Sequence, residues 1–229
     1  MIKGFMKSSF SDYPEKICST IFIGGCNFRC PYCHNADIVF NKTTELNFDQ
    51  ILKYLIGRRE KIDAVCITGG EPTLWKGLIP LMKTLKKEGF LIKLDTNGTK
   101  PGVVSHLIDN KLVDYISMDI KAPLAKYEDV ARTKVNIGEI KLSIDLIKES
   151  SIEYDFRTTV HSMFLSKKDI IQIAQELKGS RNYALQEFRY SEKLIDTGCI
   201  GTNSIDKKQL ERIKSEIEKL GLIDKVIVR

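Results

Sequence analysis

The sequence predicts an α/β fold in which a parallel sheet, covered by outer helices, curls into a partial barrel. Apolar, β-rich runs alternate with amphipathic helical stretches along the whole chain. These runs are nearly continuous in apolar residues, which is typical of parallel strands buried on both faces. About six such units fit a partly closed (β/α)6-type barrel. A flat doubly wound sheet is the competing architecture, because periodicity alone does not separate the two.

The expected elements alternate in order along the chain. The expected strands are Ile17–Gly24, Ala64–Thr68, Leu91–Asp95, Tyr115–Asp119, Tyr154–Val160 and Tyr183–Phe188. The expected helices are Asn47–Arg58, Trp75–Glu88, Val103–Asn110, Gly138–Glu149 and Lys167–Leu177. A last helix, Ser204–Leu220, precedes a short apolar end at Lys225–Val228. Trp75 thus opens a helix, where a packing role is expected.

Composition is that of an ordinary globular domain. The 229 residues are 42% hydrophobic and 29% charged, which is enough to bury one sizeable core. One domain covering residues 1–229 is therefore expected. It has a short N-terminal extension at 1–16 and the last helix and strand at 204–229.

Charge and targeting signals narrow the class of protein. The net charge of +6 is carried by dispersed lysines such as Lys83, Lys86 and Lys87, which predicts solvated helix faces. Docking of an acidic electron donor is the alternative role, and no nucleic-acid motif accompanies the charge. No apolar run is long enough to span a bilayer, and the first residues do not resemble a signal peptide, so we expect a cytoplasmic protein.

Polar motifs follow four successive strands of the expected sheet. Cys26 follows the first strand, and Gly69-Gly70-Glu71-Pro72 follows the second. The third ends in Asp95-Thr96-Asn97-Gly98, and the fourth ends in Asp119-Ile120-Lys121. Both barrels and open α/β sheets place their active sites at these carboxyl ends. The sequence therefore predicts one site at this rim.

Three cysteines lie within eight residues directly after the first strand. Cys26, Cys30 and Cys33 can surround one metal centre, with Gly24 and Gly25 permitting a tight exit from the strand. Iron–sulfur cubanes normally take four thiolates, and no fourth cysteine lies nearby. This pattern predicts a cluster with one iron open to an exogenous ligand.

A zinc ion bound by the three cysteines and His34 is the alternative. His34 directly follows Cys33, whereas zinc ligand pairs are usually separated by two or more residues. The remaining cysteines, Cys18, Cys66 and Cys199, have no ligand-like spacing and are expected to be buried small hydrophobes. No second cluster is therefore predicted.

The cysteine motif resembles a known signature. Cys26-Asn27-Phe28-Arg29-Cys30-Pro31-Tyr32-Cys33 is similar to the signature of the radical S-adenosylmethionine (SAM) superfamily. The following His34-Asn35 resembles the activating enzymes of glycyl-radical proteins, and the later rim motifs match in order. The resemblance implies a radical SAM barrel with a [4Fe-4S] cluster, SAM and a possible monovalent cation as cofactors.

Further motifs resemble one type of activating enzyme. Ser11-Asp12-Tyr13-Pro14, Asp119-Ile120-Lys121-Ala122-Pro123, Phe156-Arg157-Thr158-Thr159-Val160 and Leu185-Gln186-Glu187-Phe188-Arg189 are similar to the longer anaerobic ribonucleoside-triphosphate reductase activating proteins. This implies that the chain cleaves SAM reductively to a 5′-deoxyadenosyl radical. The radical would then generate a glycyl radical on a class III reductase. The implied partners are that reductase and a low-potential donor such as flavodoxin or ferredoxin, without nucleic acid or membrane.

The resemblance also assigns roles to individual residues. Gly69 and Gly70 would contact the SAM amino group, with Glu71 in a supporting role, and a simple turn is the alternative. Asp119 and Lys121 would bind the SAM carboxylate and ribose rather than form an exposed ion pair. The expected cluster ligands are Cys26, Cys30 and Cys33. The residues expected to bind the cofactors, with Cys33 in both sets, are Tyr32, Cys33, His34, Gly69, Gly70, Glu71, Asp95, Thr96, Asp119, Lys121 and Arg189.

Several of these assignments compete with plainer roles. Tyr32 would lie against adenine, or be an exposed loop aromatic, and Asp95 with Thr96 would bind the monovalent cation or cap a turn. Arg189 stands where the formate-lyase activase has a histidine, so stacking on adenine competes with a surface salt bridge. His161 stands where related activases often carry proline, which leaves its role open. His106 is expected on a helix surface.

Three rival functions remain open at this stage. The chain could activate another glycyl-radical enzyme, such as a formate-lyase-like protein. It could be a radical SAM enzyme for a small molecule, or a non-catalytic zinc or iron–sulfur module. The identity of the partner, the physiological reductant and the oligomeric state do not follow from the sequence.

Overall fold

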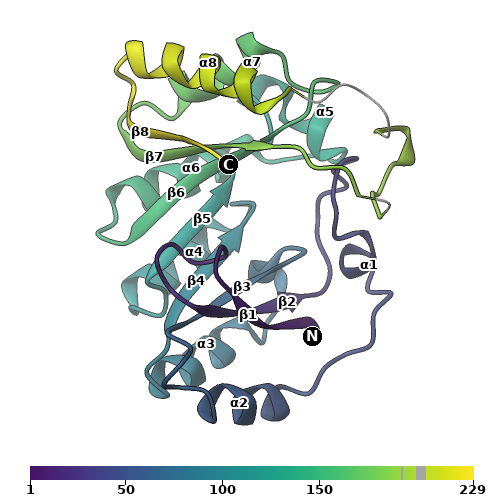
Figure 1. Cartoon of the computed structure of the whole chain (residues 1–229), viewed down its shortest axis with the longest axis vertical. Helices are drawn as coiled ribbons and strands as arrows, with labels where there is room; N and C mark the ends of the chain where they lie inside the picture. The colour runs from purple at the N-terminus through teal and green to yellow at the C-terminus, as the bar shows by residue number, and fades with distance from the viewer. Residues whose placement is uncertain (192, 200–204) are drawn as a thin grey trace.

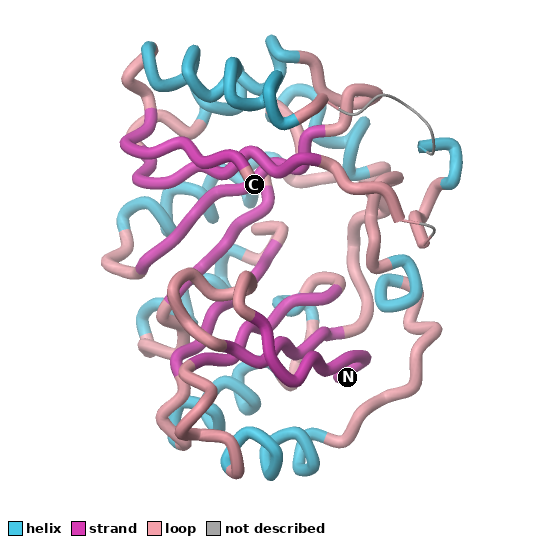
Figure 2. Tube along the Cα trace, viewed as in Figure 1, coloured by secondary structure: helices cyan, strands magenta, loops and turns pink. Residues whose placement is uncertain are grey.

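The computed structural model describes residues 1–191, 193–199 and 205–229, and its centre is a curved sheet. Within these residues the strands form one eight-stranded sheet in chain order, β1 to β8. β2 to β8 run parallel, and β1 pairs antiparallel with β2. The longer helices lie around the outside of the sheet (Figures 1 and 2). The predicted α/β fold with a partial barrel and outer helices is confirmed.

The elements match the predicted order closely. The strands are β1 Ile2–Ser9, β2 Cys18–Ile23, β3 Ala64–Gly69, β4 Leu91–Thr96, β5 Tyr115–Asp119, β6 Glu153–Val160, β7 Ser180–Glu187 and β8 Ile223–Val228. The helices are α1 Ala36–Val39, α2 Phe48–Ile56, α3 Leu78–Lys87, α4 Pro101–Asp109, α5 Tyr127–Ala131, α6 Ile137–Glu149, α7 Lys167–Glu176 and α8 Lys207–Lys219.

Alternation along the strands divides their side chains between two environments. On β3, Val65 and Ile67 join the main hydrophobic core, which also contains Leu85 of α3. Cys66, between them in the sequence, instead joins a small separate cluster with Tyr115 of β5. One row of side chains therefore packs under the helices, while the other faces the interior of the barrel.

One strand and two short helices were not predicted. β1 lies in the segment expected to be an N-terminal extension, and its sequence lacks the apolar runs of the other strands. It is added at the edge of the sheet by antiparallel pairing with β2, with two irregularities in register. α1 and α5 are only four and five residues long, too short to show a helical period.

One predicted helix boundary was wrong. Trp75 does not open a helix, because it follows a 3₁₀ turn at Pro72–Leu74 and α3 begins only at Leu78. Glu71 caps this turn by accepting a hydrogen bond from the Thr73 N–H. The expected start of the last helix at Ser204 lies outside the described residues. Among those described, no helix is both long and apolar enough to cross a bilayer.

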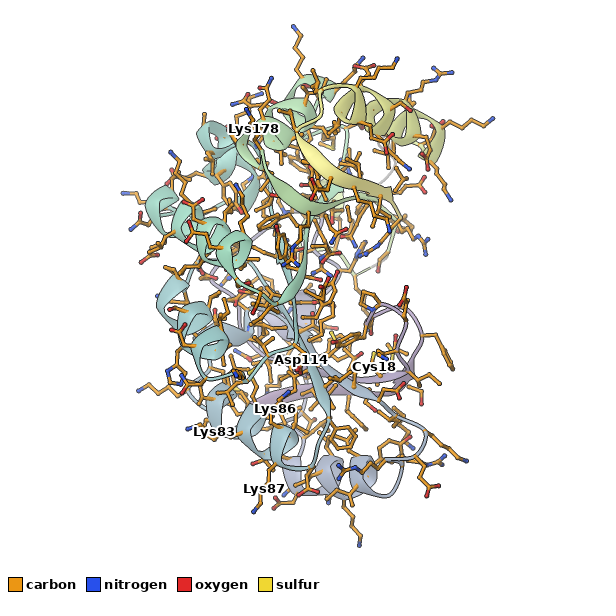
Figure 3. The ribbon with its side chains drawn as sticks, turned by 90° about the vertical axis from the view of Figure 1, so that its left-hand side faces the viewer. Cys18, Lys83, Lys86, Lys87, Asp114 and Lys178 are labelled. Atoms are coloured by element: carbon orange, nitrogen blue, oxygen red, sulfur yellow. The ribbon has the colours of Figure 1, made fainter. Side chains whose placement is uncertain are left out.

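The lysines of α3 do not all play the predicted role (Figure 3). Lys83 and Lys87 are exposed, as expected of a solvated face. Lys86 instead bonds both carboxylate oxygens of Asp114, at 2.8 and 2.9 Å. Asp114 also accepts the N–H of Ile92 at 2.7 Å, so this pair joins α3 to β4. The predicted burial of Cys18, Cys66 and Cys199 is confirmed.

Candidate functional site

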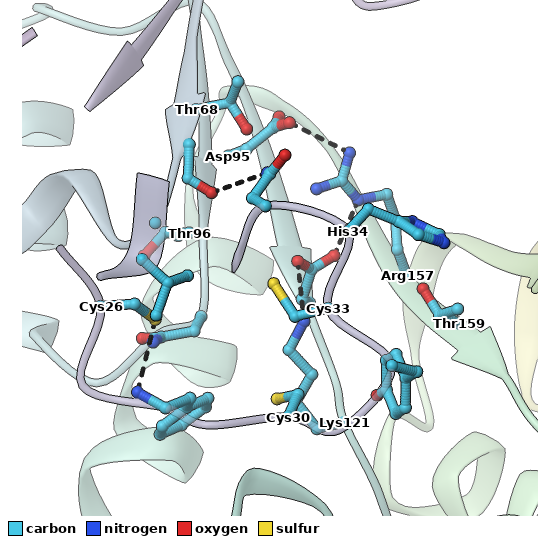
Figure 4. Close-up of a pocket in the computed structure, with 18 of the residues that line it drawn as sticks. Cys26, Cys30, Cys33, His34, Thr68, Asp95, Thr96, Lys121, Arg157 and Thr159 are labelled. Carbon is cyan, nitrogen blue, oxygen red and sulfur yellow. Dashed lines mark hydrogen bonds and ion pairs between the residues drawn. The ribbon is translucent and has the colours of Figure 1, made fainter. Parts of the chain in front are cut away.

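Most of the predicted site residues gather around one cavity at the carboxyl ends of the strands (Figure 4). Those that line it are Cys26, Tyr32, Cys30, Cys33, His34, Gly69, Gly70, Asp95, Thr96, Asp119 and Lys121. Two predicted residues have other positions. Glu71 is 1% exposed, and Arg189 lines a neighbouring cavity.

The cysteine loop is held at both of its ends. Gly25 has a φ of +83°, which lets the chain turn away from β2, and its N–H donates to the carbonyl of Ile38 at 3.0 Å. At the far end, the side-chain amide of Asn35 donates to the carbonyl of Gly69 at 3.0 Å. Between them, the Arg29 guanidinium donates to the carbonyls of Cys26 and Phe28. The three cysteines are therefore carried on a well-bonded loop.

Gly69 and Gly70 are required by the packing of that loop. A Cβ on Gly70 would lie 1.9 Å from the carbonyl oxygen of Gly25, and one on Gly69 would lie 2.4 Å from that of Ile23. The N–H of Gly70 donates to Ile23 and that of Glu71 donates to Gly25, both at 2.8 Å. The absent side chains thus allow a backbone contact within the protein, besides leaving the cavity wall open to a ligand.

Glu71 links this glycine turn to the end of β4. Its buried carboxylate accepts hydrogen bonds from Thr73, from the Thr96 hydroxyl at 2.8 Å and from the Asn97 N–H at 2.6 Å. Burial raises the pKa of Glu71, and these hydrogen bonds partly offset the effect. The geometry is that of a support for the rim, in keeping with the role expected for this residue.

Five charged side chains form a continuous chain across the floor of the site. In order they are Lys121, Asp119, Arg157, Asp95 and Lys93, and their signs alternate. Asp119 lies 3.1 Å from the Lys121 amine and 3.0 Å from Arg157 Nε, and Arg157 Nη1 lies 3.3 Å from Asp95. Lys93, 3% exposed, completes the chain by pairing with Asp95. Asp119 and Lys121 do form the ion pair considered as the alternative to SAM binding, but the pair is largely buried rather than exposed.

These contacts set the protonation states of the chain. Burial alone would raise the pKa of Asp119, but Arg157 and Lys121 outweigh it and lower the pKa to about 2. Burial would also raise the pKa of Asp95, but Arg157 and Lys93 outweigh it and lower this pKa. For Lys121, burial would lower the pKa, but Asp119 outweighs it and raises the pKa. All five groups are therefore charged at neutral pH, with one positive charge in excess. A monovalent cation at Asp95 would compete with Lys93 and Arg157 for its carboxylate.

Aromatic rings close one side of the cavity. Tyr32 is 5% exposed and packs against Phe164, His161 and Phe188, with centroids 5.7, 6.2 and 6.4 Å away. It is therefore a buried wall residue rather than an exposed loop aromatic. Its hydroxyl is buried and has no hydrogen-bond partner among the described residues, so it can bond a molecule in the cavity. His161 is fully buried in this cluster.

His34 is directed away from the cysteines. Its ring stacks on Phe188 with centroids 5.4 Å apart, and its Nε2 donates to the carbonyl of Arg189 at 2.5 Å. This hydrogen bond leaves Nδ1 as the ring nitrogen of His34 that could still bind a metal. In the described part of the chain, no three or more His, Cys, Asp and Glu side chains converge where one metal ion could be held.

The donor set fits an iron–sulfur cluster. Three thiols on one loop are the soft ligands that such clusters take. Burial raises the pKa of all three, that of Cys26 to about 12, so the free thiols are neutral and cluster binding would release protons. Lys121 points toward Cys30 and Cys33 (Figure 4), where its charge would favour thiolates.

Several polar residues of the site were not predicted from the sequence. Lys93, Arg157, Thr159 and Gln186 line this cavity or the neighbouring one. Lys93 interrupts the apolar run Leu91–Leu94 at the start of β4, and it shares a face with Asp95 through alternation. A polar residue two positions before a rim motif was the signal that could have identified Lys93.

A second cavity adjoins the first. Among its lining residues are Ser11, Asp12 and Pro14 from the β1–β2 connection, and Glu187, Arg189 and Arg229 from the ends of β7 and β8. It shares His34, Asp95, Arg157, Thr159 and Gln186 with the first cavity. The site is therefore continuous from the cysteine loop to the side of the barrel between the first and last strands.

Comparison with known proteins agrees with this fold and site. The sequence profile of the Radical SAM superfamily matches residues 20–177. The chain is 33% identical to a Methanocaldococcus jannaschii protein named "Putative glycyl-radical enzyme activating enzyme MJ1227", over 100% of this chain and 95% of that protein. It is 26% identical to the pyruvate formate-lyase-activating enzyme of Clostridium pasteurianum, over 88% and 84% of the two chains.

Solved structures show the same fold. The crystal structure of Streptococcus suis SuiB bound to S-adenosylmethionine matches with a TM-score of 0.69 and 12% identity, over 92% of this chain and 51% of SuiB. This chain thus spans about half the length of SuiB. A barrel with three clustered cysteines at its rim is the arrangement of radical SAM proteins. The chain belongs to the radical SAM superfamily and, within it, to the glycyl-radical-enzyme activating enzymes. Members of this superfamily use a [4Fe-4S] cluster and SAM.

The glycine contact yields a test of loop packing. We expect Gly70→Ala to destabilise the protein by about 1–3 kcal/mol, because the new methyl group would overlap the Gly25 carbonyl. Gly102→Ala is the matched control, since a Cβ there meets nothing within 4 Å. Urea unfolding of both variants measures the effect. Equal stability of Gly70→Ala and wild type would show that the contact imposes no constraint.

The charge chain yields a pH-dependent test. Because the pKa of Asp119 is lowered to about 2, its charge stabilises the fold above the ordinary aspartate pKa. This contribution, about 2 kcal/mol, is lost as the pH falls through about 2. Asp119→Asn should therefore be less stable than wild type at pH 7, and the difference should shrink between about pH 4 and 2. A difference in unfolding free energy that does not change with pH would contradict this assignment.

Proposed function

We propose that this chain activates an anaerobic, class III ribonucleoside-triphosphate reductase by generating a glycyl radical on it. One observation supports a class III reductase as the partner. Ser11-Asp12-Tyr13-Pro14 and the segment around Glu187 and Arg189 both resemble the activating proteins of these reductases. These two distant segments line one cavity, and that cavity is continuous with the cysteine loop.

Cys26, Cys30 and Cys33 would hold the cluster and leave one iron for SAM. When bound and reduced by an electron donor, the cluster would supply the electron that splits the carbon–sulfur bond of SAM. The resulting 5′-deoxyadenosyl radical would remove a hydrogen atom from a glycine Cα of the partner. The protein's task is to orient SAM and to keep water away from this reaction. Low exposure of Cys30 and Tyr32 supports the second part of that task.

The charge chain would orient the polar ends of SAM. Its excess positive charge suits the methionine carboxylate, and Lys121, directed toward Cys30 and Cys33, is the cation best placed to receive it. The carboxylate of Asp119 can accept hydrogen bonds from ribose hydroxyls. The peptide groups of Gly69 and Gly70, at the cavity wall, would contact the amino group.

The other predicted site residues would have roles at the wall, at the rim and at the entrance of the cavity. Tyr32 would pack against adenine and bond it through its unpartnered hydroxyl. Asp95, Thr96 and Glu71 would support the rim, since Asp95 pairs with Lys93 and Arg157 and the Thr96 hydroxyl donates to the buried Glu71. Arg189 and His34 would border the path by which the partner's glycine loop reaches the site.

Partner exchange tests this function. The protein would be reconstituted anaerobically with iron and sulfide and supplied with SAM and dithionite. It would then be mixed with a class III reductase or with a formate-lyase-type enzyme. We expect 5′-deoxyadenosine together with a glycyl signal in electron paramagnetic resonance on the reductase. A glycyl signal on the formate-lyase-type enzyme alone would assign the chain to that alternative.

A matched pair of cysteine variants separates cluster chemistry from stability. Cys30→Ala should reduce 5′-deoxyadenosine and the glycyl signal to background, because the cluster would lose a ligand. Cys66→Ala, a change of the same size at a fully buried position outside the cavity, should retain both. Full activity in Cys30→Ala would exclude the assigned cluster site.

A further inference from the structure

The outer side of the cysteine loop carries an exposed ring between two cations. Phe40, the residue directly after α1, is 43% exposed. The Arg29 guanidinium carbon lies 5.2 Å from its ring centroid, and the Lys42 amine lies 5.6 Å from it. Isolated exposed apolar side chains are normal on protein surfaces. This one differs because of the segment to which it is joined.

The Phe40 patch, defined as Arg29, Phe40 and Lys42, is bonded directly to the cluster loop. Arg29 lies between Cys26 and Cys30 in the sequence, and its guanidinium donates to the Cys26 carbonyl at 2.6 Å. The carbonyl of Ile38, two residues before Phe40, accepts the N–H of Gly25 at 3.0 Å. A partner on this patch would therefore be separated from the cluster by little more than the loop itself.

In the proposed function, the side of the loop that faces the cavity is occupied by SAM and by the glycine segment of the protein substrate. The thiols there face the glycine turn and the charge chain, which the proposed function gives to SAM. The adjoining cavity is given to the glycine segment of the protein substrate. An electron carrier must act while SAM is bound, so it needs a separate approach to the cluster. The outer face of the loop supplies one.

The charge of the patch indicates the kind of carrier. Arg29 and Lys42 flank the ring, and the carboxylate of α1, Asp37, is paired with Lys193 at 3.5 Å. The local balance is therefore positive around an apolar centre. Such a surface attracts an acidic protein and provides a ring for it to cover.

We propose that the Phe40 patch is the docking surface for an acidic one-electron carrier protein. The proposal rests on the proposed function, because only reductive SAM cleavage requires the carrier. One electron leaves the carrier and enters the cluster, and no bond or proton is exchanged in this step. Electron-transfer encounters of this kind bury little surface, so the complex is weak and sensitive to salt.

Binding of an oxidised flavodoxin to the reconstituted protein tests the surface without requiring turnover. The dissociation constant would be measured by titration at low ionic strength. Lys42→Glu should raise it about tenfold, since the change reverses a charge at the rim, and Phe40→Ala should raise it several-fold. High salt should remove the difference between Lys42→Glu and wild type.

The matched control is Lys83→Glu. It makes the same charge change at an exposed position on α3, which lies well apart from α1 in Figure 1. We expect wild-type affinity from this variant. SAM cleavage driven by reduced flavodoxin should slow in Lys42→Glu, while cleavage driven by dithionite should stay at the wild-type rate.

Two outcomes overturn the docking assignment. One is equal weakening by Lys42→Glu and Lys83→Glu, which would indicate a general effect of net charge. The other is wild-type affinity in both Lys42→Glu and Phe40→Ala. Failure of dithionite to drive SAM cleavage in the wild-type protein is a different result, because it would refute the proposed function itself.

Discussion

The site depends on one close backbone contact, that of Gly70 with the carbonyl of Gly25. This contact brings the turn after β3 against the start of the cysteine loop after β2, at a distance that excludes any side chain at position 70. Hydrogen bonds from Gly70 and Glu71 to Ile23 and Gly25 fix the same arrangement. The loop is thereby held over the strand ends, and its thiols face the polar residues of the other strands.

The charge chain beneath the loop is not required for the stability of a core. Buried ion pairs lose much of their Coulomb energy to desolvation, and apolar residues of similar size often stabilise a core as well. Here three cations and two anions extend across β4, β5 and β6, and their sum is positive. A chain of five charges with one positive charge in excess is suited to an anionic group of a ligand.

Sequence patterns were sufficient for the parallel sheet, for the bounds of strands such as β5, and for the convergence of four motifs at one rim. These features follow from strong local signals: continuous apolar runs and polar residues at strand ends. The antiparallel β1 was missed because a single edge strand needs no apolar run of its own. Gly69 and Gly70 were interpreted as a contact for SAM or as a simple turn, because the carbonyl that Gly70 meets belongs to another segment.

Long-range partners explain the remaining differences. Arg157 on β6 was named only as part of a motif, since its role arises from Asp119 on β5 and Asp95 on β4. The orientation of His34 depends on Phe188 and the carbonyl of Arg189, which local spacing does not reveal. Tyr32 was assigned to the site by resemblance, but its burial among rings from the ends of β6 and β7 required the fold.

A cluster held by three protein ligands, with its last iron reserved for SAM, is the central claim. Mössbauer spectroscopy of the ⁵⁷Fe-reconstituted protein, recorded anaerobically before and after SAM is added, tests it most directly. The account predicts a distinct iron whose parameters change when SAM binds, while the other irons stay nearly the same. Equivalent irons that do not respond to SAM would contradict it.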